Sequence, residues 1–113
     1  MVSTTILRID SLLRHIDKIF DDTKGLTIED LKKNDLLLRA TCFSIAQIGE
    51  MMVQLEKELK QKHSSIPWGP ARGMRNTIVH DYIDIDVEEV YSTINKDLPL
   101  LKASFLEIRK EIV

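Results

Sequence analysis

The side chains best suited to chemistry in this 113-residue chain gather in one stretch, residues 72–82, which reads RGMRNTIVHDY. Arg75 carries a permanently charged, planar guanidinium that suits phosphate oxygens, and His80 can take or give a proton near neutral pH. Phosphodiester cleavage without a metal ion needs both functions. In RNA the 2′-hydroxyl is an internal nucleophile, so an enzyme need only deprotonate it, protonate the leaving 5′-oxygen and stabilise the crowded anionic phosphorus.

Helical spacing relates these residues to one another. Asn76 and His80 are four apart and share a helix face, so the Asn76 amide can hold the imidazole in one orientation. Arg72 and Arg75 are neighbours at three residues. Arg75 and His80, however, are five apart, about 140° around an ideal helix. Either the arginine side chain curls back, or the helix is distorted, or the site combines residues from two copies of the chain.

Ordinary structural roles compete with this interpretation. A single arginine and histidine on one helix are most often solvated or satisfied by surface contacts, and we assign His15 and His63 to that class. Trp68, between two turn residues, is expected to cap the core and not to stack on a base. Glu50, inside a long helical stretch, matters for the cluster only if its side chain faces it.

Composition indicates one compact domain spanning residues 1–113. The chain is 43% hydrophobic and 30% charged, with a net charge of −2 and a single cysteine. Cys42 can form no internal disulfide and is expected to be a reduced core residue of a cytoplasmic protein. No apolar run approaches the length that spans a bilayer, no signal-peptide pattern opens the chain, and no cofactor or metal-ligand spacing is present. We therefore expect neither a membrane protein nor a secreted one.

The small net charge hides an asymmetry. Residues 1–56 carry −2 and residues 81–113 carry −4, whereas residues 57–80 carry +4. This cationic stretch is either a solvated charge run or a patch that faces phosphates.

Hydrophobic periodicity predicts helices throughout. Residues 6–20 form an amphipathic helix, and Thr27 with Asp30 resembles a capping box that opens a second helix over about 28–61, which Asn34 and Asp35 can break. A second apolar set in that helix, Leu37, Phe43 and Met51, needs cover either from the chain's own bundle or from a second copy of the protein.

The C-terminal half follows the same logic. Residues 63–70 contain two prolines and form a loop, after which Gly69 and Pro70 suit the N-cap and first turn of a short helix reaching about Tyr82. Asp86 caps a last helix that Pro99 should kink or split near residue 97. With no period-two alternation, the expected fold is all-α, an antiparallel up-and-down bundle of four to five helices.

The spacing Arg75-x-x-x-x-His80-x-Tyr82 resembles the signature of the HEPN superfamily, specifically its HepT-like toxins. The likeness spans roughly residues 38–108 and includes further short matches: Ile48-Gly-Glu50, Ile66-Pro-Trp68, Gly73-Met-Arg-Asn76, Val79-His-Asp-Tyr82, Ile85-Asp86 and Leu98-Pro99. It implies an all-helical, HEPN-like homodimer that cuts RNA without a metal ion. Arg75 and His80 would be the catalytic residues in a cleft between protomers, with Asn76 and Arg72 in supporting positions.

The resemblance also implies a partner. HepT-like toxins belong to type VII toxin–antitoxin pairs, in which a nucleotidyltransferase antitoxin of the MntA type transfers AMP from ATP to the motif tyrosine, here Tyr82. An anion tethered one or two turns from Arg75 would occupy the guanidinium and block a substrate phosphate.

Two other functions compete with the ribonuclease. A non-catalytic helical module could dock a nucleotidyltransferase or bind a nucleotide, with Arg75 and His80 serving only as anion contacts, and the acidic overall charge suits it. A purely structural dimer would tolerate Arg75→Ala without consequence. Which RNA is cut, and whether dimers assemble further, stay open at this point.

Overall fold

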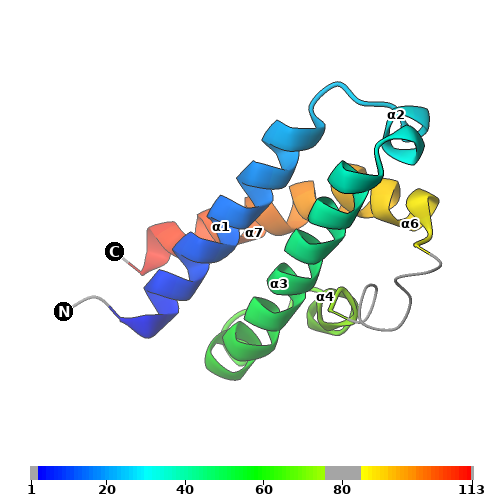
Figure 1. Cartoon of the computed structure of the whole chain (residues 1–113). Coiled ribbons are helices and arrows are strands. Elements are labelled where there is room, and N and C mark those ends of the chain that lie inside the picture. The colour runs from blue at the N-terminus through cyan, green and yellow to red at the C-terminus, as the bar shows by residue number, and fades with distance from the viewer. Residues whose placement is uncertain (1–2, 76–84, 113) are drawn as a thin grey trace.

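The structure is a computed structural model that describes residues 3–75 and 85–112 (Figure 1). All regular structure in these ranges is helical, which confirms the predicted all-α class. The elements are, in order, α1 (Thr4–Thr23), α2 (Ile28–Lys33), α3 (Asp35–Leu59), α4 (Trp68–Gly73), α6 (Val87–Ser92), η1 (Thr93–Asp97) and α7 (Leu98–Glu111).

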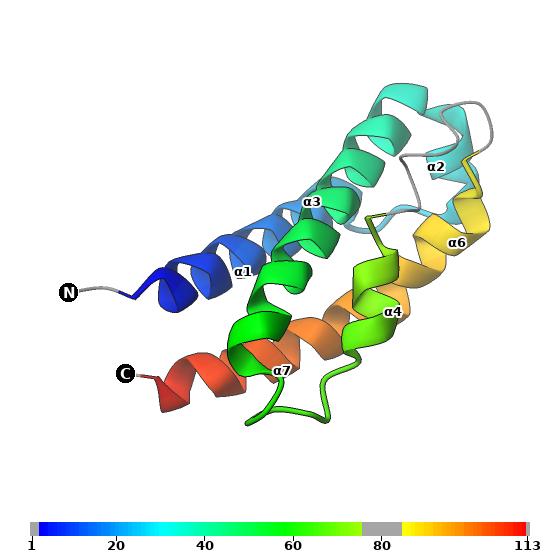
Figure 2. The same cartoon turned by 90° about the horizontal axis from the view of Figure 1, so that it is seen from below.

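Helices α1 and α3 lie side by side and antiparallel, connected at one end of the molecule through α2 (Figure 1). The α6–η1–α7 segment returns across them, and α7 packs on α1, so that the two ends of the chain lie at the same end of the molecule (Figure 2). Helix α4 packs on the other flank of α3. The long helix α3 therefore lies at the centre of the molecule, and its contacts with α4 position the residues of α4.

The expected helix over 28–61 is divided in two at Asn34. The capping box is confirmed at the first part: the Thr27 hydroxyl accepts from the Asp30 N–H at 3.2 Å, and the Asp30 carboxylate accepts from the Thr27 N–H at 2.8 Å. The Asn34 side chain then accepts from the Leu37 N–H at 3.1 Å and caps α3. The short polar side chain that ends one helix thus begins the next.

Pro99 divides the last helix near the expected position. Asp86 caps α6 through the Glu89 N–H at 3.2 Å. From Thr93 to Asp97 the chain widens into a π-helical turn, in which the Leu98 N–H donates to the Thr93 carbonyl. A proline at the start of α7 offers no N–H and crowds the carbonyl four residues earlier, so the wider turn accommodates it without ending the helical path.

Buried side chains of α1, α3 and the α6–η1–α7 segment form one core. Cys42 is among them, 1% exposed, and burial raises the pKa of its thiol to about 11, which confirms a core residue that is unreactive at neutral pH. The fully buried large side chains are Phe105, Ile9, Leu12, Ile16, Ile19, Leu31, Ile45, Ile48, Met52, Leu55, Leu98 and Val90.

Helix α3 corrects the expectation that no segment is long and apolar enough to cross a membrane. Its 25 residues include a window with a mean hydropathy of 1.3, which meets that criterion by length and composition alone. The helix nevertheless packs against α1, α2 and α4, and it supplies a large share of the core. A central helix that is covered on several sides acquires the same composition as a membrane span.

Helix α4 begins two residues earlier than predicted, because the first helical hydrogen bond runs from the Ala71 N–H to the Pro67 carbonyl at 3.0 Å. Pro67 is therefore the N-cap, not Gly69. Trp68 is 4% exposed, donates through Nε1 to the His63 carbonyl at 3.0 Å, and packs edge-to-face on Phe105. Its predicted role in the core is confirmed, and it ties α4 to α7. The predicted single helix reaching about Tyr82 is wrong in its described part, because α4 ends at Gly73 and Met74 and Arg75 form a turn. The rest of that prediction, residues 76–82, lies outside the described residues.

Candidate functional site

The predicted site residues divide into two groups. Arg72 lies in α4 and Arg75 in the turn that follows it. Asn76, His80 and Tyr82 lie outside the described residues, and so does the relation between His80 and Arg75. The structure accordingly defines the cationic half of the predicted site.

Arg72 is committed to an ion pair with α3. Its guanidinium contacts both carboxylate oxygens of Glu56, whose side chain is only 13% exposed, and Lys60 contacts the same carboxylate at 3.4 Å. The hydrogen bond from Arg72 lowers the pKa of Glu56 below its ordinary value, with Lys60 contributing less. Arg72 thus holds α4 on α3, and its supporting position at the site stays a prediction.

Arg75 is placed differently. It is half-buried, its backbone N–H donates to the Arg72 carbonyl at 3.3 Å, and its backbone lies against α3 at Gly49. Within residues 3–75 and 85–112, no carboxylate pairs with its guanidinium.

The cations of stretch 57–80 therefore differ in their surroundings: some are exposed to solvent and some are paired with a carboxylate. Glu56 pairs with both Lys60 and Arg72, while Lys57 and Lys62 are exposed. Arg75 is the half-buried cation that this pairing leaves over in the described portion of the stretch.

The other singled-out residues have ordinary roles. His15 Nδ1 lies 2.9 Å from the Ser11 carbonyl, and His63 Nε2 lies 3.6 Å from a carboxylate oxygen of Glu111. Both histidines are satisfied, as expected. Glu50 is exposed on α3, next to Gly49, and forms no ion pair with any residue the structure describes. The same portion of the chain holds no cluster of three or more His, Cys, Asp or Glu suited to a metal ion.

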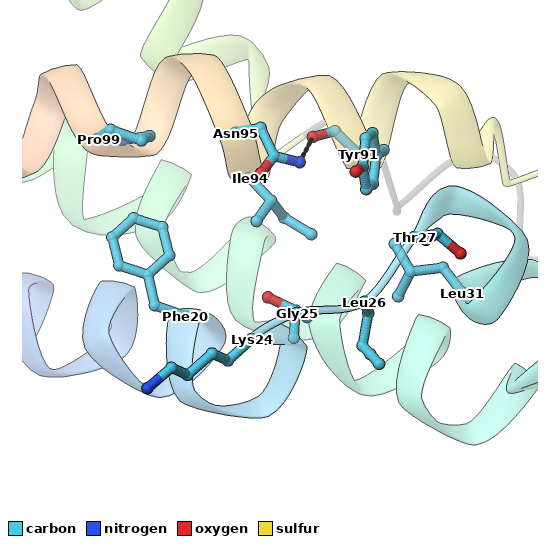
Figure 3. A pocket seen from close by; sticks show the side chains of 11 residues that line it. Phe20, Lys24, Gly25, Leu26, Thr27, Leu31, Tyr91, Ile94, Asn95 and Pro99 are labelled. Atoms are coloured by element: carbon cyan, nitrogen blue, oxygen red, sulfur yellow. Dashed lines mark hydrogen bonds between the residues drawn. The ribbon is translucent and has the colours of Figure 1, made fainter.

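A cavity of about 490 Å³ lies away from these residues, between the end of α1 and the α6–η1 segment (Figure 3). Phe20 and Ile94 face each other across it, and the Asn95 amide at its rim donates to the Tyr91 carbonyl at 2.8 Å. It contains none of the predicted site residues.

A second cavity, of about 480 Å³, adjoins α4 on the side of α6 and η1. Met74 and Leu101 contribute apolar surface, and the carboxylates of Glu89 and Asp97 also line it. Two carboxylates repel a phosphate, so this groove does not suit a nucleic-acid backbone.

Sequence reasoning did not assign two residues that position this site. Glu56 is 16 residues from Arg72, and no local pattern pairs them. The role of Gly49 could have been predicted from the sequence. A glycine inside a helix costs about 1 kcal/mol of stability relative to alanine, and such a glycine is typical of a place where another backbone approaches closely.

A helical domain with an Arg75-x-x-x-x-His80-x-Tyr82 segment has the features of a HEPN-type ribonuclease domain. Comparison with known proteins agrees: the chain belongs to the ribonuclease HepT-like family, whose sequence profile matches residues 12–108. The predicted family and its HEPN-like fold are thereby confirmed.

Individual relatives cover most of the chain. A protein of Caldanaerobacter subterraneus subsp. tengcongensis, provisionally named an RNase, is 33% identical over 100 residues, which are 88% of this chain and 89% of that protein. A protein of Methanocaldococcus jannaschii with the same provisional name is 29% identical over 89% of this chain and 84% of its own length. A probable ribonuclease HepT of Thermococcus cleftensis is 28% identical over 90% and 93%. No solved structure matches significantly.

The Glu56 pair makes stability depend on pH. Because the pKa of Glu56 is lower in the folded state, its contribution to stability is complete above the unfolded-state pKa and is lost as the pH falls from there through the lowered folded-state pKa. We expect Glu56→Gln to lower the free energy of unfolding at pH 7, and the difference from the wild type to shrink across that window. Urea unfolding at a series of pH values measures it.

Glu58→Gln is the matched control, since Glu58 lies on the same helix but pairs with Arg8 of α1. It should retain the pH dependence that Glu56 produces. A wild-type minus Glu56→Gln difference that stays constant from pH 7 to pH 3 contradicts the assignment.

Proposed function

We propose that this chain, folded as a single HEPN-like domain over residues 1–113, is a metal-independent endoribonuclease that acts in the cytoplasm as the toxin of a type VII toxin–antitoxin pair. The observation that carries the proposal is the Arg75 guanidinium, which no described carboxylate neutralises, at the start of a signature inside the range that matches the ribonuclease HepT-like family. Its substrate is RNA.

The chemistry follows from the two side chains. Arg75 binds the non-bridging oxygens of the scissile phosphate and stabilises the extra negative charge of the five-coordinate transition state. The 2′-oxygen attacks phosphorus, a 2′,3′-cyclic phosphate forms, and the bond to the 5′-oxygen breaks. His80 acts as the base that takes the 2′-hydroxyl proton or as the acid that protonates the departing 5′-oxygen, and Asn76 orients its imidazole.

The helix α3 offers a surface for a second copy of the chain. Leu36 and Phe43 are 72% and 62% exposed, and with exposed Ala40 between them they lie on one face at positions i, i+4 and i+7. Leu37 and Met51, from the predicted second apolar set, instead pack at the edge of the chain's own core. Two large apolar side chains that are exposed to water on one helix face favour a dimer in which both are buried.

This face leads towards Arg75. Glu50 follows Phe43 by seven residues on the same face of α3, and its neighbour Gly49 contacts the backbone of Arg75. A second protomer seated on Leu36 and Phe43 therefore borders the Arg75 side chain. We assign the active cleft to this border, with Arg75 of one protomer acting together with the partner's His80, a pairing that removes the difficulty of the five-residue spacing.

The proposed inactivation is a modification of the same site. A nucleotidyltransferase of the MntA type transfers AMP from ATP to the Tyr82 phenol oxygen and releases pyrophosphate. The new phosphodiester anion lies seven residues from Arg75 in sequence and competes with RNA phosphate for the guanidinium.

Removal of the proposed acid–base group should have a large effect. We expect His80→Ala to lower RNA cleavage about 10²- to 10⁴-fold, and Arg75→Ala to lower it about 10²- to 10³-fold, with the fold retained. The assay follows a labelled RNA in a buffer that contains EDTA, with circular dichroism as the check on folding. The products should carry 2′,3′-cyclic phosphate ends.

His63→Ala is the matched histidine control and should cleave at the wild-type rate. Wild-type activity in His80→Ala refutes the assignment of His80. RNA that is bound but never cut by the wild type favours the non-catalytic binding module, and activity that is lost in EDTA and restored by a divalent metal refutes metal independence.

A charged side chain placed in the proposed dimer surface tests whether that surface is buried between protomers. Phe43→Glu buries a carboxylate in the proposed interface and should raise the dimer dissociation constant by about 30-fold or more, with loss of cleavage at concentrations where the variant is monomeric. Leu106→Glu places the same charge at an exposed leucine of α7 and should change neither property. Sedimentation velocity measures the assembly, and a Phe43→Glu protein that stays as dimeric as the wild type contradicts the surface.

The modification is tested by mass. Incubation with an MntA-type nucleotidyltransferase and ATP should add the mass of one AMP residue and abolish cleavage. Tyr82→Phe should escape the modification and stay active, whereas Tyr91→Phe, which changes the chain's other tyrosine, should be modified as the wild type is. Modification of Tyr82→Phe to the same extent as the wild type excludes Tyr82 as the acceptor.

A further inference from the structure

Gly49 is buried in the middle of α3 and faces the backbone of Arg75. A Cβ atom added at Gly49 would lie 2.4 Å from the Arg75 nitrogen and 3.0 Å from its Cα and Cβ. Real Cβ atoms essentially never approach another heavy atom within 3.0 Å, and the nearest atom here is backbone, which cannot rotate aside. A side chain at position 49 would therefore push the Arg75 backbone outwards by about 1 Å before ordinary contact at 3.4 Å is reached.

The other glycines around α4 lack this constraint. A Cβ at Gly69 meets only the Arg72 side chain, at an ordinary 3.8 Å, and one at Gly73 meets nothing within 4 Å. The close approach is thus a property of the point where Arg75 meets α3.

A second attachment lies two turns along the same helix. Gly49 and Glu56 are seven residues apart, on one face of α3 and about 10 Å apart along its axis. Glu56 pairs with Arg72, and Gly49 contacts Arg75. Since Arg72 and Arg75 are neighbours three residues apart, the two contacts fix α4 antiparallel to α3 in one register.

We infer that Gly49 and Glu56 are positioning residues for the RNA-cleaving site. Because Gly49 has no side chain, the Arg75 backbone can lie directly against α3. The Glu56–Arg72 ion pair fixes where Arg75 lies along the axis of α3. This inference rests on the proposed function, because the value of a fixed guanidinium is its fit to a phosphorus centre whose charge grows during cleavage. A displacement of about 1 Å in such a group costs on the order of 10²-fold in rate.

A double-mutant cycle separates positioning from general damage to the fold. In single-turnover RNA cleavage we expect Gly49→Ala to slow the wild type about 10²-fold. In the Arg75→Ala background the same change should slow the remaining reaction by no more than about twofold, since the group it displaces is already gone. Gly69→Ala adds the same methyl group where there is room and should leave the rate unchanged in both backgrounds.

Should Gly49→Ala fail to fold by circular dichroism, Glu56→Gln takes its place, because it loosens the second attachment without adding an atom. It should slow the wild type about three- to tenfold and leave the Arg75→Ala background unchanged within about twofold. Glu58→Gln, whose partner is on α1, is its control.

Two results overturn the inference: a folded Gly49→Ala protein that cleaves at the wild-type rate, or equal losses with and without Arg75. RNA cleavage by the wild type is measured first, because it tests the proposed ribonuclease function alone. A wild type that does not cleave RNA refutes that function, whereas an active wild type with either result above refutes only the positioning role of Gly49 and Glu56.

Discussion

Helix α4 runs antiparallel along α3, and at Gly49 the two backbones meet without room for a side chain between them. This contact fixes where the Arg75 backbone lies. The Glu56–Arg72 ion pair holds the same two helices two turns away, and Trp68 fastens the start of α4 to Phe105 of α7. An arginine side chain is long and flexible, so its charge can be placed accurately only if its backbone is held from several directions.

The electrostatics of α4 follow from the same contacts. One carboxylate on α3, that of Glu56, pairs with both Arg72 and Lys60, so these two cations contribute to structure. The carboxylates of Glu89 and Asp97 make the opposite flank of α4 unsuitable for phosphate. Among the described residues of stretch 57–80, Arg75 is the half-buried cation that no carboxylate pairs with.

Much of the fold could be predicted because its signals are local. The capping box at Thr27, the helix break at Asn34 and the interruption before Pro99 each depend on residues within one or two turns of one another, and all three are confirmed. The predicted N-cap at Gly69 was wrong, since a proline carbonyl can accept the first helical hydrogen bond as well as any other.

The site was less predictable, because its contacts join distant residues. Nothing in the order of amino acids pairs Glu56 with Arg72 or brings Arg75 to Gly49, since both contacts depend on how the loop after α3 folds back. The five-residue spacing of Arg75 and His80 left three arrangements open, and because Arg75 lies in the turn after α4 the geometry of an ideal helix does not choose among them. We propose that the site combines residues from two copies of the chain.

Subunit mixing tests that central claim most directly. Arg75→Ala and His80→Ala dimers, each inactive, are combined in equal amounts under conditions in which protomers exchange, and RNA cleavage is measured against the wild type. If Arg75 of one protomer works with the partner's His80, half of the dimers are mixed and each has one intact site, so about a quarter of the wild-type activity should return. A mixture that exchanges subunits fully and remains as inactive as its two components contradicts the account.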